Sequence, residues 1–195
     1  GQRELLRAVA GVLPAAAGRC TVTAPVAFIP EDRTTEGLLP SLSLTANVAL
    51  GLAHGAEWGR GLRLDWAAAR EATVELLAAH DVRAASADVP AGSLSGGNQQ
   101  KLLIGRALAL GPAVLVAENP TRGLDVQATR TVHDRLREAA AAGLAVLLHS
   151  TDLDEVLAIG SRVVVLASGR LLVPATVDRA TVGALMLRGT GGADA

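Results

Sequence analysis

The segment LSGGNQQK at residues 94–101 is the stretch on which the interpretation of this chain depends. Ser95 is a residue type that caps helices, and Leu103, Ala107 and Leu110 recur at helical spacing after it, so a helix is predicted over residues 95–110. Glycines let a backbone approach a ligand closely, and the first N–H groups of a helix lack partners within it. The segment predicts a phosphate site at the helix N-terminus, with an ordinary capped helix after a flexible turn as the alternative.

A second informative stretch follows on the C-terminal side. Residues 113–117, AVLVA, predict a fully apolar strand, and the loop ENPTRGLD at 118–125 comes directly after it. Ligands of open α/β sheets bind where buried parallel strands end, so Glu118 is a candidate site residue. Apolar strands alternating with helices predict an α/β fold with a mostly parallel sheet that is covered on both faces.

Hydrophobic patterns extend this alternation along the chain. Asp65 is expected to cap one predicted helix, and Thr45 a short helix through Leu52. A loop is predicted over residues 31–43, a helical insertion over 45–91 and a flexible tail over 189–195. The predicted helices are residues 2–10, 64–80, 95–110, 126–142, 153–159 and 180–187, and the predicted strands are 26–29, 113–117, 144–148, 162–167 and 170–173.

The composition excludes several classes of protein. Half of the 195 residues are apolar and 19% are charged, which is enough for a packed core and rules out disorder as the main description. The 18 basic and 19 acidic residues give a net charge of −1, without the basic excess of nucleic-acid-binding proteins. The longest apolar runs are about half of the ~20 residues that a membrane helix needs. One cysteine and four scattered histidines predict neither a disulfide nor a metal site.

Five motifs in order resemble the ATP-binding cassette (ABC) ATPases, and most of all the second cassette of bacterial importers for simple sugars or nucleosides. They are IPEDR at 29–33 with Gly37, Leu38 and Asn47 downstream, LSGGNQQK at 94–101, PTRGLDV at 120–126, DLDEVL at 152–157, and SRV at 161–163 with the hairpin to Gly169. The resemblance covers about residues 1–172. It implies a P-loop NTPase-like ABC cassette over residues 1–188.

The resemblance also implies roles for individual residues. In this family the signature motif caps the γ-phosphate of ATP held by the opposite cassette, and here it would consist of Ser95, Gly96, Gly97, Asn98 and Gln99. Glu31 matches a loop that contacts metal and couples to membrane subunits, with a solvated turn as the alternative. The loop at the dimer seam matches Gly123, Leu124 and Asp125, and Asp125 is also a candidate N-cap of the next helix.

Other positions depart from the family pattern. The chain contains no G-x-x-x-x-G-K-[ST] run, so the cassette is expected to be N-terminally truncated, without the first strand and the P-loop. The remnants of its own ATP site would be Gly1, Gln2, Arg3, Glu31 and Glu118. Gln2 then stands at the P-loop lysine position, Arg3 at the position of the Mg²⁺-binding hydroxyl, and Glu118 where an aspartate usually contacts the metal shell.

The catalytic positions of this own site are changed as well. Asn119 stands at the position of the catalytic glutamate, and asparagine cannot accept a proton. Loss of a general base lowers a rate by ~10²–10⁴. Thr151 stands at the position of the switch histidine, and His149, two residues earlier, is interpreted as a partner for backbone or water. The resemblance therefore implies a degenerate own site beside an intact signature motif.

The resemblance implies an ATP-binding and ATP-hydrolysing subunit of an importer for sugars or nucleosides, with ATP and Mg²⁺ held mainly by the partner. The implied partners are a first ABC cassette, in the same polypeptide or as a dimer partner, membrane permease subunits and, indirectly, a substrate-binding protein. The implied place is peripheral, at the cytoplasmic face of the bacterial cell membrane.

Two other interpretations remain at this point. The first is a catalytically inactive regulatory or dimerisation half, or a truncated fragment without ATPase activity; the isolated chain is expected to be inactive. The second is a nucleic-acid-binding ATPase of the same superfamily, which fits less well because the net charge of −1 gives no basic surface for phosphates.

Overall fold

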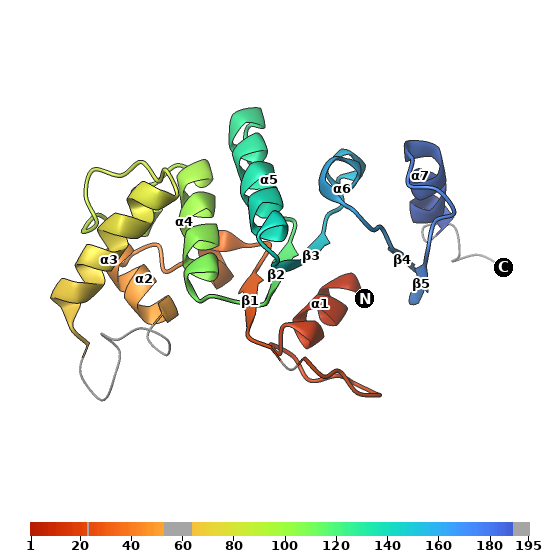
Figure 1. Cartoon of the computed structure of the whole chain (residues 1–195), viewed down its shortest axis with the longest axis horizontal. Coiled ribbons are helices and arrows are strands. Elements are labelled where there is room, and N and C mark those ends of the chain that lie inside the picture. The colour runs from red at the N-terminus through yellow and green to blue at the C-terminus, as the bar shows by residue number, and fades with distance from the viewer. Residues whose placement is uncertain (23, 53–63, 189–195) are drawn as a thin grey trace. The chain divides into compact units, whose positions relative to one another are not determined.

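The computed structural model of the chain describes residues 1–22, 24–52 and 64–188. These residues fall into two compact units. The α-helices and strands of both units are labelled in Figure 1. The central unit spans residues 22–147, and the terminal unit combines residues 1–21 with those from 148 onward. The predicted tail, 189–195, and residues 53–63 of the predicted insertion lie outside the described residues. The division into one cassette domain with an insertion over 45–91 stays a prediction.

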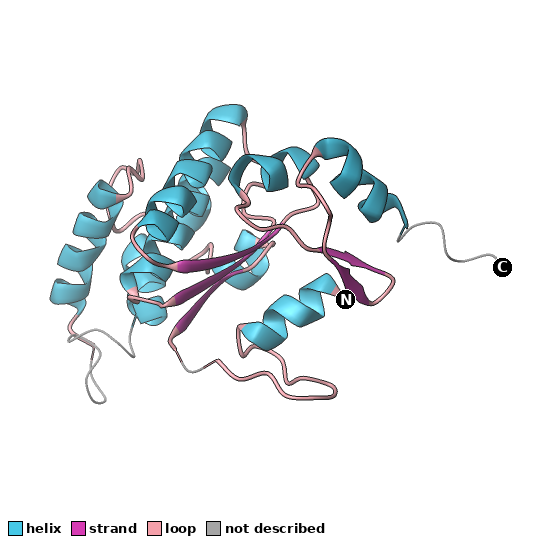
Figure 2. Ribbon diagram, turned by 45° about the vertical axis from the view of Figure 1, so that its right-hand side comes forward, coloured by secondary structure: helices cyan, strands magenta, loops and turns pink. Residues whose placement is uncertain are grey.

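The core of the central unit is a sheet in the order β1-β2-β3, whose strands lie side by side in Figure 2. The strands are β1 (Val26–Ile29), β2 (Val114–Glu118) and β3 (Ala145–His149), whose last two residues belong to the terminal unit. β1 and β2 pair in parallel, with Phe28 opposite Val116. Residues 115–117 of β2 are completely buried, as its uninterrupted apolar sequence predicts. The α/β architecture with parallel pairing is confirmed.

Four α-helices accompany this sheet in the described part of the central unit: α2 (Leu44–Leu52), α3 (Trp66–Ala79), α4 (Gly96–Ala109) and α5 (Val126–Ala141). The predicted cap of α3 is confirmed, since the Asp65 carboxylate accepts hydrogen bonds from the N–H groups of Ala67 and Ala68, both at 3.1 Å. α2 and α3 are the described part of the predicted helical insertion, and both pack against α4.

Two local predictions in this unit are wrong. The loop predicted over 31–43 contains a short π-helix, η1 (Arg33–Gly37). Elsewhere, a 3₁₀ turn, η3 (Ala91–Ser93), lies just before α4. Thr45 does not cap α2, because its hydroxyl donates to the carbonyl of Ala87 at 3.1 Å. Ser43 takes that role, and its hydroxyl accepts from the N–H of Ala46 at 3.1 Å.

The terminal unit contains three α-helices and a hairpin within its described residues: α1 (Gln2–Val9), α6 (Leu153–Ile159), β4 (Val165–Ala167), β5 (Arg170–Leu172) and α7 (Arg179–Arg188). β4 and β5 are antiparallel, and the turn between them places Ser168 and Gly169 at positive φ. The small core of the terminal unit consists of Val163, Val165, Ala167 and Val182. The predicted elements of this region are therefore present, with shorter strands.

β3 departs from the prediction of a sheet covered on both faces. Leu147 is 40% exposed and Ala145 is also exposed, although their segment is as apolar as β2. β3 stands at one end of the strand order, so that β2 is its only neighbour among the described strands. β1 stands at the other end of the order and its Ala27 and Ile29 are buried, so neither an end position nor the apolar sequence accounts for the exposure along β3.

None of the described helices is both long enough and apolar enough to cross a membrane.

Candidate functional site

The first turn of α4 carries the candidate phosphate site, and residues 95–99 are here called the signature turn. Ser95 is the N-cap of α4 in extended backbone conformation. Its Oγ accepts hydrogen bonds from the Asn98 backbone N–H at 3.4 Å and from the Asn98 side-chain amide at 3.1 Å. The predicted helix start is thereby confirmed, and the hydroxyl is held at the positive end of the helix dipole.

The hydrogen bonds around Ser95 decide where its proton can go. Asn98 Oδ1 accepts from the backbone N–H of Arg83 at 3.0 Å, so the NH₂ end of this amide faces Ser95. Both Asn98 groups donate to Ser95 Oγ and use its acceptor capacity. A serine hydroxyl has one proton to donate, and this proton must point away from the two donors. The signature turn therefore offers an O–H and helical N–H groups to an anion, which fits a phosphate oxygen.

A second loop, residues 31–33, lies against the signature turn. The Asp32 carboxylate accepts from the N–H groups of Thr34 and Thr35 at 3.0 and 3.1 Å and from the Thr34 hydroxyl at 2.8 Å. These hydrogen bonds lower the pKa of Asp32 to about 2, and the carboxylate caps η1. Arg33, the first residue of η1, then reaches the signature turn, where its Nε donates to Gln99 Oε1 at 3.4 Å.

The loop after β2 is the third part of the site. Arg33 Nη1 donates to the carbonyl of Arg122 at 3.0 Å, and Arg122 itself forms an ion pair with Glu31. Asp125 caps α5 by accepting from the N–H of Ala128 at 2.8 Å, as one of its two predicted roles requires. Gly123 before it has a φ of +70°, where glycine is favoured. Three loops of the central unit thus meet around one guanidinium group.

Glu118 and Asn119 stand at the end of β2, at the edge where a parallel sheet binds ligands. Glu118 is 1% exposed and Asn119 is 7% exposed. Asn119 has a φ of +41°, in the left-handed region that asparagine tolerates better than most residues, and its carbonyl accepts from the N–H of Arg122 at 3.0 Å. The carboxamide at this position cannot take a proton from water.

The other predicted site residues belong to the terminal unit. The Gly1 ammonium donates to Gln2 Oε1 at 3.3 Å and pairs with Glu4 at 3.5 Å, and Arg3 is exposed on α1. Thr151 is exposed between β3 and α6, and His149 is the last residue of β3. The structure brings Glu31, the signature turn and the loop after β2 together. The residues of the terminal unit that were predicted as site residues are described within that unit alone.

Lys101, the last residue of the LSGGNQQK segment, is only 15% exposed in its side chain. Its ammonium binds the carbonyl and the carboxylate of Asp81 just after α3, at 2.9 and 2.7 Å. Lys101 lowers the pKa of Asp81 through this contact. Its role is therefore to hold the end of α3 against α4.

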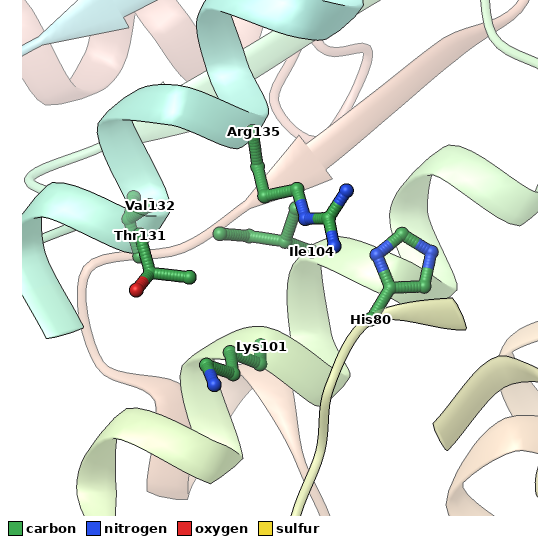
Figure 3. Close-up of a pocket in the computed structure, with 6 residues that line it drawn as sticks. All are labelled: His80, Lys101, Ile104, Thr131, Val132 and Arg135. Carbon is green, nitrogen blue, oxygen red and sulfur yellow. The ribbon is translucent and has the colours of Figure 1, made fainter. Parts of the chain in front are cut away.

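Lys101 also lines a small pocket shown in Figure 3. The Arg135 side chain points toward the His80 ring in this pocket, and burial followed by the charge of Arg135 lowers the pKa of His80. The pocket has room for about one water molecule. It does not compete with the signature turn as a ligand site. Its lining residues are His80, Lys101, Ile104, Thr131, Val132 and Arg135.

Among the described residues, no group of three or more His, Cys, Asp or Glu side chains could hold a metal ion. No step through Mg²⁺ is therefore assigned to the described part of this chain.

Sequence reasoning quoted Arg33 as part of a motif but missed its function as the centre of the site. Arg122 was likewise quoted only as part of PTRGLDV, and Ala128 lies outside every quoted motif. The available signal was the pair Gly96-Gly97 in the first turn of a helix, because glycine is a poor helix former and two in a row indicate close neighbours. The sequence did not say which residues those neighbours are.

Comparison with known proteins places this geometry in a family. The chain is 35% identical over its whole length to the glucose import ATP-binding protein TsgD13 of Haloferax volcanii and 39% identical to the ribose import ATP-binding protein RbsA 1 of Streptomyces coelicolor. It is 34% identical over 97% of its length to the nucleoside import ATP-binding protein NupA of Lactococcus lactis. The chain spans 38–41% of the length of these relatives. No protein-family model matches the chain.

Solved structures agree with the sequence relatives. A dimeric ATP-binding cassette in a post-hydrolysis state, bound to ADP and Pi, superposes with a TM-score of 0.62 at 26% identity, over 75% of this chain and 60% of that one. A putative metal-chelate type ABC transporter has the same fold, with a TM-score of 0.68 at 23% identity over 88% of this chain and 66% of that one. The fold is that of an ATP-binding cassette. The chain belongs to the ABC ATPase family and carries part of one cassette, and its sequence relatives are ATP-binding proteins of sugar and nucleoside import.

Proposed function

We propose that this cassette donates its signature turn to ATP held by a partner cassette, while its own ATP site lacks a general base. The observation that carries the proposal is the orientation of Ser95. Asn98 occupies the acceptor side of the hydroxyl, so the proton is directed away and is available to an anion. The loop after β2, by contrast, presents the Asn119 carboxamide where hydrolysis needs a proton acceptor.

The reaction would be the in-line attack of water on the γ-phosphate of ATP. Ser95 would donate its hydroxyl proton in a hydrogen bond to a γ-phosphate oxygen, and the N-terminus of α4 would stabilise the charge that develops there. The partner would supply the P-loop, the general base and the Mg²⁺ ligands. Mg²⁺, when bound there, neutralises negative charge on the phosphates. The contribution of this chain is thus electrostatic and positional.

The cargo and the partners are part of the proposal. Relatives of this chain are named for the import of glucose, ribose and nucleosides, which supports a sugar or a nucleoside as cargo. The dimeric cassette structure supports a second cassette as the direct partner. A role in import would also require membrane permease subunits. The chain would then lie at the cytoplasmic face of the cell membrane as a peripheral subunit.

An inactive regulatory or dimerisation half is the second candidate function. Asn119 favours it, because the change to asparagine removes proton transfer without removing the loop that lies at the proposed seam. This candidate predicts that the chain pairs with another cassette and alters its properties without being needed for ATP turnover. The two candidates therefore differ in whether Ser95 matters for turnover.

The test is ATP turnover by the full chain joined to a cassette that carries an intact P-loop. Ser95→Arg places a long cation where the phosphate would lie, and we expect turnover to be abolished. Asn119→Ala should change turnover little, because the base at work belongs to the partner. Asp65→Ala serves as the matched control, since it removes the N-cap of α3 and leaves the signature turn unchanged.

Turnover that survives Ser95→Arg contradicts signature donation and favours the regulatory candidate. A large loss with Asn119→Ala, at unchanged stability, contradicts the degenerate own site. Loss with Asp65→Ala as severe as with Ser95→Arg would mean that any lost cap disrupts the pair. Unfolding midpoints of all the variants separate these effects from a loss of folded protein.

A further inference from the structure

The side chain of Arg33 contacts both the signature turn and the loop after β2. Its Nε donates to Gln99 Oε1 at 3.4 Å and its Nη1 donates to the carbonyl of Arg122 at 3.0 Å. A planar guanidinium can bind two acceptors in fixed directions, which an ammonium group does not do. Arg33 therefore connects the loop at 31–33, the signature turn and the loop after β2 through one rigid group.

Both acceptors of Arg33 are themselves fixed. The Gln99 side-chain amide donates to the carbonyl of Ala91 at 3.2 Å, so its oxygen faces Arg33, and Gln99 is buried. On the other side, the ion pair between Arg122 and Glu31 returns to the loop from which Arg33 comes. A displacement of Arg33 would break contacts with both neighbouring loops.

Gly96 provides a second, independent observation. A Cβ atom added at Gly96 would lie 2.7 Å from Arg33 Nη2, which is too close for any real pair of such atoms. Gly97 is crowded differently, since its Cβ would lie 3.0 Å from the Cβ of Ala128 on α5. The space beside Gly96 is thus already filled by Arg33, and that beside Gly97 by α5.

We propose that Arg33 is the positioning residue of the signature turn: its guanidinium fills the space left open by Gly96 and binds Gln99 and the Arg122 carbonyl, so that the three loops move together. This inference deepens the proposed function and rests on it for its effect on turnover. Gly96 is then glycine to admit an arginine of its own chain, whereas the resemblance assigns it to ATP held by the partner. The two assignments predict different behaviour for the same substitution.

A double-mutant cycle with Arg33→Ala and Gly96→Ala tests the contact in the full chain by urea unfolding. In the Arg33 background, Gly96→Ala should lower the unfolding midpoint, because the new methyl displaces the guanidinium. In the Arg33→Ala background it should leave the midpoint unchanged or raise it, because the space is empty and alanine favours helix over glycine. Equal shifts in both backgrounds overturn the proposal.

Gly97→Ala is the matched control, one residue along the same helix. Ala128→Gly should relieve its effect and Arg33→Ala should not, because the crowding atom belongs to α5. A second cycle, Arg33→Ala with Gln99→Leu, keeps the test in force if Gly96→Ala does not fold. Non-additive midpoints support the contact and additive ones overturn it.

ATP turnover of the joined pair provides the functional measurement. We expect Arg33→Ala to lower kcat roughly tenfold at saturating ATP, a size typical of coupled groups, and Arg33→Lys not to restore it. Gly96→Ala should add no further loss in the Arg33→Ala background. A large further loss there means that Gly96 faces the partner's ATP, which overturns the positioning role and leaves the proposed function standing. If the unfolding midpoints are coupled but the joined pair has no ATP turnover, the positioning role of Arg33 stands and the proposed function is contradicted.

Discussion

The signature turn and the loop after β2 lie in the same unit and share Arg33, yet they differ in what they have kept. The signature turn has its N-cap serine, oriented by Asn98 so that the hydroxyl can donate. The loop after β2 has its shape, with Asp125 capping α5 and Arg122 bound by Arg33, but an asparagine in place of the acid. Under the proposed function, one region keeps its chemistry and the other only its geometry.

This difference follows from which ATP each region would serve. In the proposed pair of cassettes, the signature turn would act on the partner's ATP, whereas a base after β2 would act on the chain's own. A change from glutamate to asparagine removes proton transfer at one site without disturbing the contacts that hold the other.

The first way to sharpen the comparison uses the backbone of Asn119, whose φ is +41°. A left-handed conformation costs a residue with a Cβ roughly 1–2 kcal/mol, while glycine adopts it freely. Asn119→Ala should therefore be less stable than Asn119→Gly by about 1 kcal/mol in urea unfolding. Both variants lose the carboxamide, so their difference isolates the backbone. Equal stabilities of the two variants would mean that the left-handed backbone at residue 119 does not destabilise alanine relative to glycine, which contradicts this prediction.

A smaller effect comes from the turn that precedes Arg33. The pKa of Asp32 in the folded chain is about 2, below its usual 3.8, so the folded state favours the ionised form. Its stabilising contribution is then complete above the unfolded pKa and is lost as the pH falls toward 2. The difference in unfolding free energy between wild type and Asp32→Asn should be constant above about pH 5 and shrink below pH 4.

The control for this titration is built into the pair of proteins, because Asp32→Asn keeps the side-chain shape and removes the charge. A difference that stays constant down to pH 2 would contradict the hydrogen bonds from Thr34 and Thr35. It would also remove the support for the fixed position of Arg33 at the start of η1.

Much of the fold was predictable because the rules that determine it are local. The caps of α3 and α4, at Asp65 and Ser95, follow from residue type at the start of a helical pattern. β2 follows from a continuous apolar run between helices. β3 has the same kind of sequence but is exposed at Ala145 and Leu147, because burial depends on what packs against a strand and not on its own residues alone.

The candidate site shows the same division. The serine and the glycines of the signature turn could be predicted from residue types at a helix start. The function of Arg33 could not, because it depends on contacts with residues 66 and 89 positions away in the chain. Likewise, Thr45 and Ser43 are both plausible caps, and only the carbonyl of Ala87 decides between them.

The measurement that tests the central claim most directly is ATP turnover by the joined pair after its partner cassette has lost the P-loop lysine. The account assigns turnover to the partner's ATP site, capped by Ser95, and none to the site beside Asn119. It predicts that turnover falls to background and that Asn119→Ala then changes nothing further. Residual turnover of a sizeable fraction, abolished by Asn119→Ala, would show a working site in this chain and contradict the account.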